Sequence, residues 1–218
     1  MIQQYVASGN VLTKKTVLDI LVPLMSFEHG RAGDQSRIIA SFVINFGGLQ
    51  KAVRDIQDFG NENDGRLENQ TIRGYIEEVL QLVYHVVRWS KTFNEIGQPD
   101  GRDLILSRQC MQHFGHFVDL KESRFKAEDG NKSEYAAEYI TLFSYASKIV
   151  AYLINIDLPN FKENIIILSE YQTFNAIFGA IHIAEGMQEM QMFYDGLVAI
   201  SFFLETPKIS QKALLNLD

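Results

Sequence analysis

The chain has 218 residues, of which 46% are hydrophobic and 22% charged, with only four prolines and one cysteine. This apolar content can build a core, so the composition excludes a disordered chain, a collagen-like repeat and a disulfide-rich scaffold. The formal net charge of −7 argues against broad binding to nucleic acid, which relies on lysine and arginine neutralising phosphates.

The cysteine count and the distribution of apolar residues indicate the compartment. Cys110 has no second cysteine with which to form an intramolecular disulfide, as is usual in a reducing environment. No charge-free apolar run reaches the roughly 18 residues that a membrane-spanning helix needs. The longest such stretch, over residues 165–183, is interrupted by Glu170. We therefore expect a soluble, cytoplasmic protein with no membrane partner and no cofactor.

Apolar residues recur at helical spacing along the first half of the chain. The clearest face consists of Leu49, Ala52, Val53, Ile56 and Phe59. The same period predicts helices over residues 13–27, 34–46 and 71–93. Pro23 should end or kink the first of these, Asp34 should cap the second, and Gly47-Gly48 should separate the second from the next helix.

Helical spacing continues through the second half. It predicts helices over residues 102–125, 134–154, 162–184 and 187–204, and a short last helix from Thr206-Pro207. The segment 162–184 is apolar around most of its circumference, which is typical of a central, buried helix. One face of the following helix carries Met190, Phe193, Leu197, Ile200 and Leu204.

These patterns predict an all-α protein with no significant sheet. The simplest architecture is a single globular domain over residues 1–218, a bundle of about seven to nine helices. The alternative is a division near residues 126–133, where a polar stretch interrupts the helical pattern.

A candidate catalytic pair lies in the predicted helix over residues 102–125. Arg108 and His113 form an Arg-x4-His motif, which resembles the Arg-x4-to-6-His signature of HEPN-domain ribonucleases, an all-helical family common in prokaryotic defence and toxin systems. The resemblance implies metal-independent RNA cleavage, with Arg108 stabilising the phosphate charge and His113 moving protons. Five residues turn a regular helix by about 140° beyond a full turn, so the pair needs a bend or a second subunit to share one site.

A candidate metal site overlaps this motif. His113, His116 and Asp119 are spaced by three residues, so the two imidazoles lie near each other on one helix and could share a metal ion. A third ligand would have to come from another helix. Side chains of a suitable type are His182, Glu185 and Glu189. The alternative is a pair of partly exposed histidines that bind nothing, and we assign no metal.

Two further clusters have structural interpretations. The first is a polar strip that the pattern assigns to an exposed helix face rather than to a catalytic carboxylate: Glu77, Glu78, His85 and Arg88. The second is a methionine group whose spacing favours the core, although methionine can also line adaptable grooves: Met187, Met190 and Met192.

The function expected from these features is mainly one of binding. The sequence contains no Gly-x-Ser-x-Gly elbow, no phosphate-binding Gly-x4-Gly-Lys loop and no His-Glu-x-x-His motif. Its 15 phenylalanines and nine tyrosines are residues favoured at interface cores. We expect a non-enzymatic interaction or assembly protein, either a homo-oligomer or an accessory subunit of a larger complex with a protein partner. The alternative is the HEPN-like ribonuclease, with RNA as its substrate.

Overall fold

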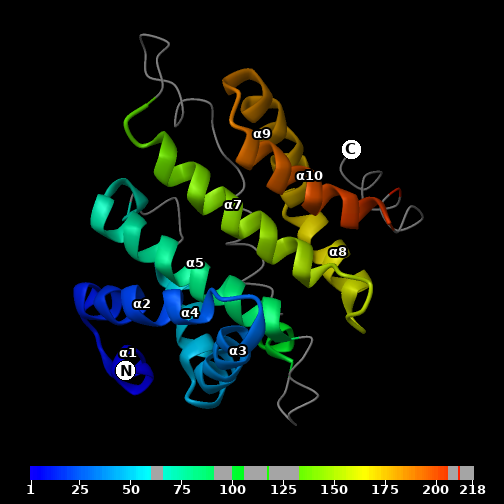
Figure 1. The fold of residues 1–218 in the computed structure, drawn as a ribbon. Helices are drawn as coiled ribbons and strands as arrows, with labels where there is room; N and C mark the ends of the chain where they lie inside the picture. The colour runs from blue at the N-terminus through cyan, green and yellow to red at the C-terminus, as the bar shows by residue number, and fades with distance from the viewer. Residues whose placement is uncertain (60–65, 91–99, 106–116, 118–132, 206–210, 212–218) are drawn as a thin grey trace. The chain divides into compact units, whose positions relative to one another are not determined.

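The computed structural model describes residues 1–59, 66–90, 100–105, 117, 133–205 and 211 (Figure 1). All regular structure in these residues is helical and none is a strand, which confirms the all-α prediction. The α-helices are α1 (Ile2–Ala7), α2 (Val11–Met25), α3 (Gly30–Asn45), α4 (Gly48–Phe59), α5 (Gln70–Ser90), α7 (Ala136–Leu153), α8 (Phe161–Glu170), α9 (Thr173–Met187) and α10 (Met190–Leu204). Two short 3-10 helices are η2 (Arg66–Glu68) and η4 (Gly101–Leu104).

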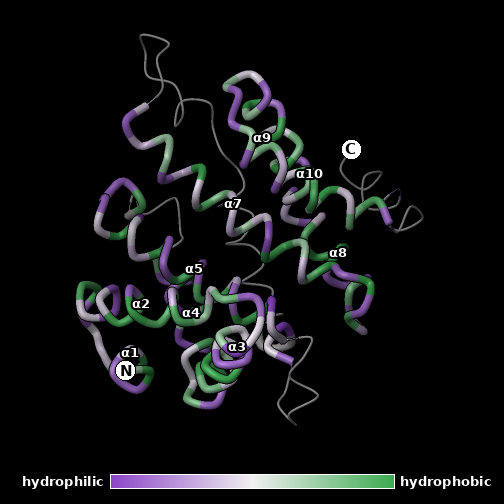
Figure 2. The backbone as a smooth tube through the Cα atoms, viewed as in Figure 1, coloured by the Kyte–Doolittle hydropathy of each residue, from purple (hydrophilic) through white to green (hydrophobic). Residues whose placement is uncertain are grey.

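The chain forms two compact units, Met1–Cys110 and Met111–Asp218. Helices α1 to α5 belong to the first unit and α7 to α10 to the second. Within each helix the hydropathy changes every few residues (Figure 2), as expected of helices that bury one face. The single domain over residues 1–218 stays a prediction. Among the described helices, none combines the length and the apolar character needed to cross a membrane.

Helix α5 is the centre of the first unit, because α2, α3 and α4 all pack against it. Its buried side chains include Ile76, Val79, Val83 and Val86. The β-branched residues that lower the helix propensity of this segment are therefore the ones that fill the core. Packing against three neighbours offsets that weak propensity, because most helical stability in proteins comes from tertiary contacts.

The first unit confirms the predicted helix ends in two places and corrects one. Helix α2 ends at Met25, two residues after Pro23, and a left-handed Gly47 (φ +74°) separates α3 from α4. The predicted cap at Asp34 is wrong, because α3 begins four residues earlier, at Gly30. Gly30 has a φ of +63°, a backbone conformation that glycine adopts without strain, so the chain turns into the helix before it reaches Asp34.

The second unit is built around α10, which packs against both α7 and α9. The rings of Phe174 on α9 and Phe203 on α10 stack with their centroids 4.0 Å apart. Both rings are almost completely buried. Aromatic side chains bury more area than other residues, so this pair anchors the contact between the two helices.

The predicted helix over residues 162–184 is wrong in two respects. It is two helices, because Gln172 adopts a left-handed conformation (φ 55°) between α8 and α9, and its N–H bonds to the Ser169 carbonyl at 2.9 Å. It is also not buried on all sides, since Ile166 is 45% and Phe178 43% exposed. No glycine or proline marks the break, so hydropathy and turn residues do not reveal it.

The junction between α9 and α10 also differs from the prediction. Gln188 takes a left-handed conformation (φ 59°), and α10 begins at Met190 rather than at residue 187. Of the five apolar residues predicted to share a face of α10, only Ile200 is buried. The buried side of the helix instead consists of Met192, Asp195, Gly196, Ala199, Ile200 and Phe203.

Candidate functional site

Only some of the residues predicted to be catalytic or metal-binding lie in the part of the chain that the structure describes. Arg108, His113, His116 and Asp119 lie outside the described residues, so the ribonuclease pair and the metal set both stay predictions. Of the additional metal ligands considered, His182 and Glu185 lie together, with 3.7 Å between Nδ1 and Oε2, and both side chains are largely exposed. In the part of the chain that the structure describes, no three His, Cys, Asp or Glu side chains form a metal-binding group.

The polar strip on α5 is less exposed than its sequence predicts. Glu77, Glu78 and Arg88 are half-buried, and His85 is only 6% exposed. Arg88 donates to Glu28 Oε1 at 2.8 Å and to the Met25 carbonyl at 3.0 Å. The interpretation as a solvated face is wrong, because α2, α3 and α4 pack against α5 and Arg88 bonds to residues at and just after the end of α2.

The methionine group divides between core and surface. Met192 is completely buried, Met187 is half-buried and Met190 is 70% exposed. The core interpretation is therefore correct for Met192 and wrong for Met190. The left-handed turn at Gln188 comes two residues before the start of α10, so Met187 and Met190 lie on different helices.

A buried carboxylate is the most highly connected polar group of the first unit. Asp55 on α4 is completely buried, and its Oδ1 accepts from Lys14 Nζ at 2.9 Å and from Lys51 Nζ at 2.8 Å. Its Oδ2 accepts from Tyr75 OH at 2.5 Å and from Tyr5 OH at 3.3 Å. We call these five residues the Asp55 cluster. It joins α1, α2, α4 and α5 through a single side chain.

Burial controls the protonation of the Asp55 cluster. It raises the pKa of Tyr5 well above its usual value, and the Asp55 charge adds to that increase. Burial is also the main reason why the pKa of Tyr75 is raised. Burial lowers the pKa of Lys14, although the hydrogen bond to Asp55 opposes this change. For Lys51, burial is the largest single influence and lowers the pKa, but the hydrogen bonds to Asp55 and Lys14 and the nearby carboxylate charges together raise it, so the net shift of its pKa is upward.

The chemistry available to the Asp55 cluster is structural. Both carboxylate oxygens are occupied by donors, and the groups that hold them are buried or half-buried, so no oxygen is open to a substrate. A buried charge of this kind is tolerated only when it is fully paired. Through Tyr5, the cluster fastens the short helix α1 to the rest of the first unit.

Helix α1 forms one wall of an open apolar groove of about 420 Å³ in the first unit. The groove is lined by Met1, Ile2, Gln3, Leu21, Leu24, Ile39, Phe42 and Phe46. Seven of these eight side chains are apolar, and the buried Leu21 is the floor. Phe42 on α3 and Phe46, the residue that caps the end of α3, lie one turn apart, with their ring centroids 6.2 Å apart.

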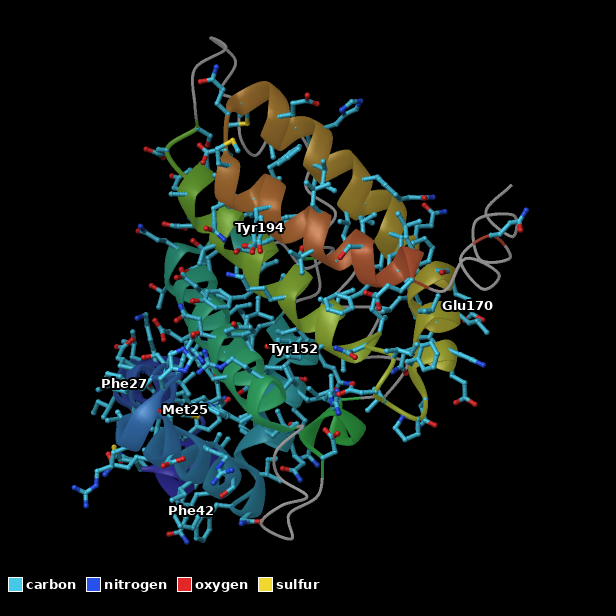
Figure 3. The ribbon with its side chains drawn as sticks, turned by 45° about the vertical axis from the view of Figure 1, so that its right-hand side comes forward. Met25, Phe27, Phe42, Tyr152, Glu170 and Tyr194 are labelled. Carbon is cyan, nitrogen blue, oxygen red and sulfur yellow. The ribbon has the colours of Figure 1, made fainter. Side chains whose placement is uncertain are left out.

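The groove continues into an exposed apolar face on α2 and α3. This face consists of Ile20 and Leu24 on α2, Phe27 just after α2, Ile38 and Phe42 on α3, and Phe46, the residue that ends α3, each between 40% and 54% exposed. Phe27 and Phe42 lie on the outside of the first unit in Figure 3. The hydroxyl of buried Ser36 on α3 donates to the Leu24 carbonyl of α2 at 2.7 Å, which fixes the two helices that present the face.

The second unit also contains a buried aspartate. Asp195 on α10 is 3% exposed, and its Oδ2 accepts from Ser144 on α7 and from Gln191 Nε2 at 2.9 Å. Lys148 on α7 completes an ion pair at 3.3 Å, and its side chain is 29% exposed. We call these four residues the Asp195 cluster. It joins only α7 and α10.

Comparison with known proteins leaves the fold and the groove as the basis for assigning a function. No protein-family model matches this sequence, and neither a curated protein nor a solved structure matches it. The class of protein is therefore defined by its own features. It is an all-helical protein whose first unit presents an open apolar groove, with the Asp55 cluster fixing one wall.

Proposed function

We propose that the protein is a non-enzymatic interaction module that binds an amphipathic helix of a partner protein in the groove of the first unit. The observation that carries this proposal is the exposed apolar face on α2 and α3, continuous with the groove. Helix-in-groove binding uses apolar side chains spaced by three or four residues on the partner, inserted into a hydrophobic cleft.

The size of the apolar face supports a macromolecular partner. The three half-exposed phenylalanines alone present on the order of 300 Å², and Ile20, Leu24 and Ile38 extend that area. The largest apolar patch on a typical monomer is about 300–600 Å² and is often functional. A patch of this size that carries three aromatic rings marks a binding surface more often than an ordinary solvated face.

The polarity of the groove favours a helix over a small molecule. Sites for small ligands place several polar groups so that they orient the ligand. Gln3 is the one polar side chain that lines this groove. An amphipathic helix needs no such orienting groups, because its apolar side chains enter the groove and its polar face stays in water.

Site-specific photo-crosslinking in the source cells tests this proposal. Phe46 and Phe27 are replaced one at a time by p-benzoylphenylalanine, and the crosslinked proteins are identified by mass spectrometry. We expect both positions to capture the same polypeptide through a segment with apolar residues at helical spacing. Adding Phe42→Glu should lower the crosslinked yield from position 46 about tenfold, as for loss of a central aromatic contact.

The matched control is Phe178 on α9, which is 43% exposed compared with 49% for Phe46. The same crosslinker at position 178 should not capture that polypeptide. The proposal is wrong if position 178 captures the same proteins as position 46, or if the yield survives Phe42→Glu. Because Phe42 is half-exposed, a melting curve of the Phe42→Glu variant should match that of the wild type, which excludes unfolding as the cause of lost binding.

A further inference from the structure

Helix α10 in the second unit buries its one charged residue and leaves several apolar residues exposed. The one charged residue of the helix is Asp195, which is buried. The opposite side carries Met190, Tyr194, Leu197 and Leu204, which are 70%, 63%, 43% and 54% exposed. Tyr194 lies on this helix in Figure 3. A helix that faces water normally presents charged or polar residues on that side, so this face is suited to a partner.

The spacing of the exposed residues indicates the shape of that partner. Residues 190, 194, 197, 201 and 204 are separated alternately by four and three positions, and the remaining member, Ser201, is also exposed. This is the spacing of the a and d positions of a coiled coil, in which the seam of one helix packs against the seam of another. We call these five residues the α10 seam. Its occupant should therefore be an α-helix.

We infer that the α10 seam packs against the same seam of a second copy of this chain, antiparallel, with a two-fold axis at Leu197. In this arrangement Met190 lies opposite Leu204 of the second copy, and Leu197 meets its own counterpart. Tyr194 lies three residues from the axis and Ser201 of the second copy lies four residues from it, so the two positions are offset by about 1.5 Å along the helices and a large side chain lies beside a small one. A parallel pair would instead place Tyr194 against its own copy and leave the two serines facing each other.

The electrostatics of the seam are compatible with this arrangement. The five seam residues carry no charge, and the nearest acidic residues apart from the buried Asp195 are Glu189 and Glu205 at the two helix ends, which lie opposite each other in this register. No charged residues flank the seam within α10 to select a different partner or a parallel register. Antiparallel helices also place the positive end of each macrodipole beside the negative end of the other.

The area available sets the expected strength of the dimer. The exposed side chains of the seam and their half-exposed neighbours present on the order of 500 Å² per copy. A dimer would bury about 1,000 Å² in total, which is the lower limit for a specific interface. We therefore expect a dissociation constant in the micromolar range, so that monomer and dimer both exist at accessible concentrations.

The second unit holds α10 in the rotation that exposes the seam. Asp195 is bound by Ser144 and Lys148 of α7 on the buried side of the helix. One residue further, a Cβ on Gly196 would lie 2.6 Å from Ile181 Cγ1, so α10 and α9 approach closely there. Turning the seam inward would expose Asp195 and break this contact. The seam is therefore available in the folded monomer.

Sedimentation velocity of the full chain from about 1 to 500 μM, a range that brackets a micromolar dissociation constant, tests the dimer. The wild type should change from monomer to dimer with rising concentration. Leu197→Glu should raise the dissociation constant about a hundredfold, since it places a charge at the centre of the interface. The matched control is Ile166→Glu on α8, because Ile166 is 45% exposed compared with 43% for Leu197. Ile166→Glu should leave the dissociation constant unchanged.

Cysteine crosslinking tests the orientation in a Cys110→Ser background, which removes the only native cysteine. Leu197→Cys should form a disulfide dimer under mild oxidation. Met190→Cys should not, because in an antiparallel pair the two copies of this position are about 21 Å apart. A mixture of Met190→Cys and Leu204→Cys chains should crosslink to each other.

Three results would overturn the inference. The first is a protein that stays monomeric at every concentration. Resistance of Leu197→Cys to alkylation would then show that another segment of the chain covers the seam. The second is a dimer that survives Leu197→Glu. The third is self-crosslinking of Met190→Cys as efficient as that of Leu197→Cys. Phe42→Glu should leave the dimer intact, which separates the seam from the groove of the first unit.

Discussion

The two units of this protein bury the same kind of ion pair in different surroundings. In the first unit, Asp55 and Lys14 are almost completely enclosed, and two tyrosines and a second lysine complete the set of donors. In the second unit, Asp195 is equally buried, but Lys148 keeps 29% of its side chain exposed. An enclosed charge depends entirely on its protein partners, whereas a partly exposed one keeps some of its water.

The two clusters also position different surfaces. The Asp55 cluster connects four helices and holds α1 against the groove, so its role is to build a concave site. The Asp195 cluster connects two helices and sets the rotation of α10, so its role is to turn a convex seam outward. In each unit, a buried polar cluster therefore positions the exposed apolar surface.

The largest expected difference in stability between the two units follows from removing their buried aspartates. Asp55→Ala removes the carboxylate that the enclosed Lys14 and the two tyrosines share, and we expect it to lower the free energy of unfolding of the first unit by about 3–5 kcal/mol. Asp195→Ala should cost the second unit only about 1–2 kcal/mol, because Lys148 reaches water. Urea titrations measure both values. Far-UV circular dichroism follows all helices, and fluorescence of Trp89, the only tryptophan, follows the first unit.

Combining Asp55→Leu with Lys14→Met provides the control for this experiment. Replacing a buried ion pair by apolar residues of similar size is often neutral, so the double variant should recover much of the stability that Asp55→Ala loses. Equal losses from Asp55→Ala and Asp195→Ala would show that enclosure of the lysine does not matter.

The second largest expected difference is in the pH dependence of stability, which should distinguish the first unit from the second. The raised pKa values of Tyr5 and Tyr75 mean that both stay protonated in the folded protein at pH values where they ionise in the unfolded chain. The contribution of the two tyrosines to the free energy of unfolding is complete below about pH 10. It falls as the pH rises further, by up to about 2.7 kcal/mol per pH unit for two protons. The raised pKa of Lys51 acts in the same direction, and the lowered pKa of Lys14 acts against it.

Tyr75→Phe isolates the tyrosine contribution. It should reduce the alkaline slope by about 1.4 kcal/mol per pH unit, because one of the two protons is removed. Urea titrations between pH 9 and 11.5, followed by Trp89 fluorescence, give this slope. Tyr194→Phe, which removes an exposed hydroxyl, should leave it unchanged. An identical slope for wild type and Tyr75→Phe would contradict the assignment.

The smallest expected difference in stability between the two units comes from substituting one glycine in each. A Cβ on Gly48 would lie 2.9 Å from the Val43 carbonyl oxygen and 3.3 Å from Ile2 in the groove wall. Backbone cannot move aside cheaply, so Gly48→Ala should cost about 1–3 kcal/mol. A Cβ on Gly196 would meet side-chain atoms only, the nearest being Cγ1 of the half-buried Ile181, and a side chain is displaced at lower cost than backbone. The gain of about 0.5–1 kcal/mol from replacing a mid-helix glycine should bring Gly196→Ala close to neutral.

Thermal and urea unfolding of both glycine variants measure this contrast. A larger loss for Gly196→Ala than for Gly48→Ala would mean that the approach of α10 to α9 is more rigid than that of α4 to the groove wall. In that case the seam of the second unit would be the more firmly held of the two surfaces.

Much of the helical architecture is readable from the sequence, but its breaks are not. The spacing of Leu49, Ala52, Val53 and Ile56 predicts α4, and these four residues are buried. The breaks at Gln172 and Gln188 carry no glycine or proline. Each is a left-handed residue whose N–H bonds to a nearby carbonyl. Such a turn depends on how the flanking helices pack, which local residue preferences do not report.

The candidate sites, like the helices, are only partly predictable from the sequence. Lys14 and Asp55 each fall among the apolar residues of a buried helix face, and a charge at such a position is a signal of a buried pair. Their separation of 41 residues along the chain means that no local pattern identifies them as partners. Phe42 belongs to an apolar stripe that reads as core, although it is 47% exposed.

The periodicity of apolar residues by itself determined that this chain is helical, because a 3.6-residue repeat leaves one face to be buried in each helix. Which apolar face is buried and which is left outside was decided only by tertiary structure. In α10, whose sequence is apolar nearly all round, hydrophobicity does not select a rotation. The rotation follows from one carboxylate that must reach Ser144 and Lys148, because an unpaired charge in the interior costs more than an apolar stripe in water.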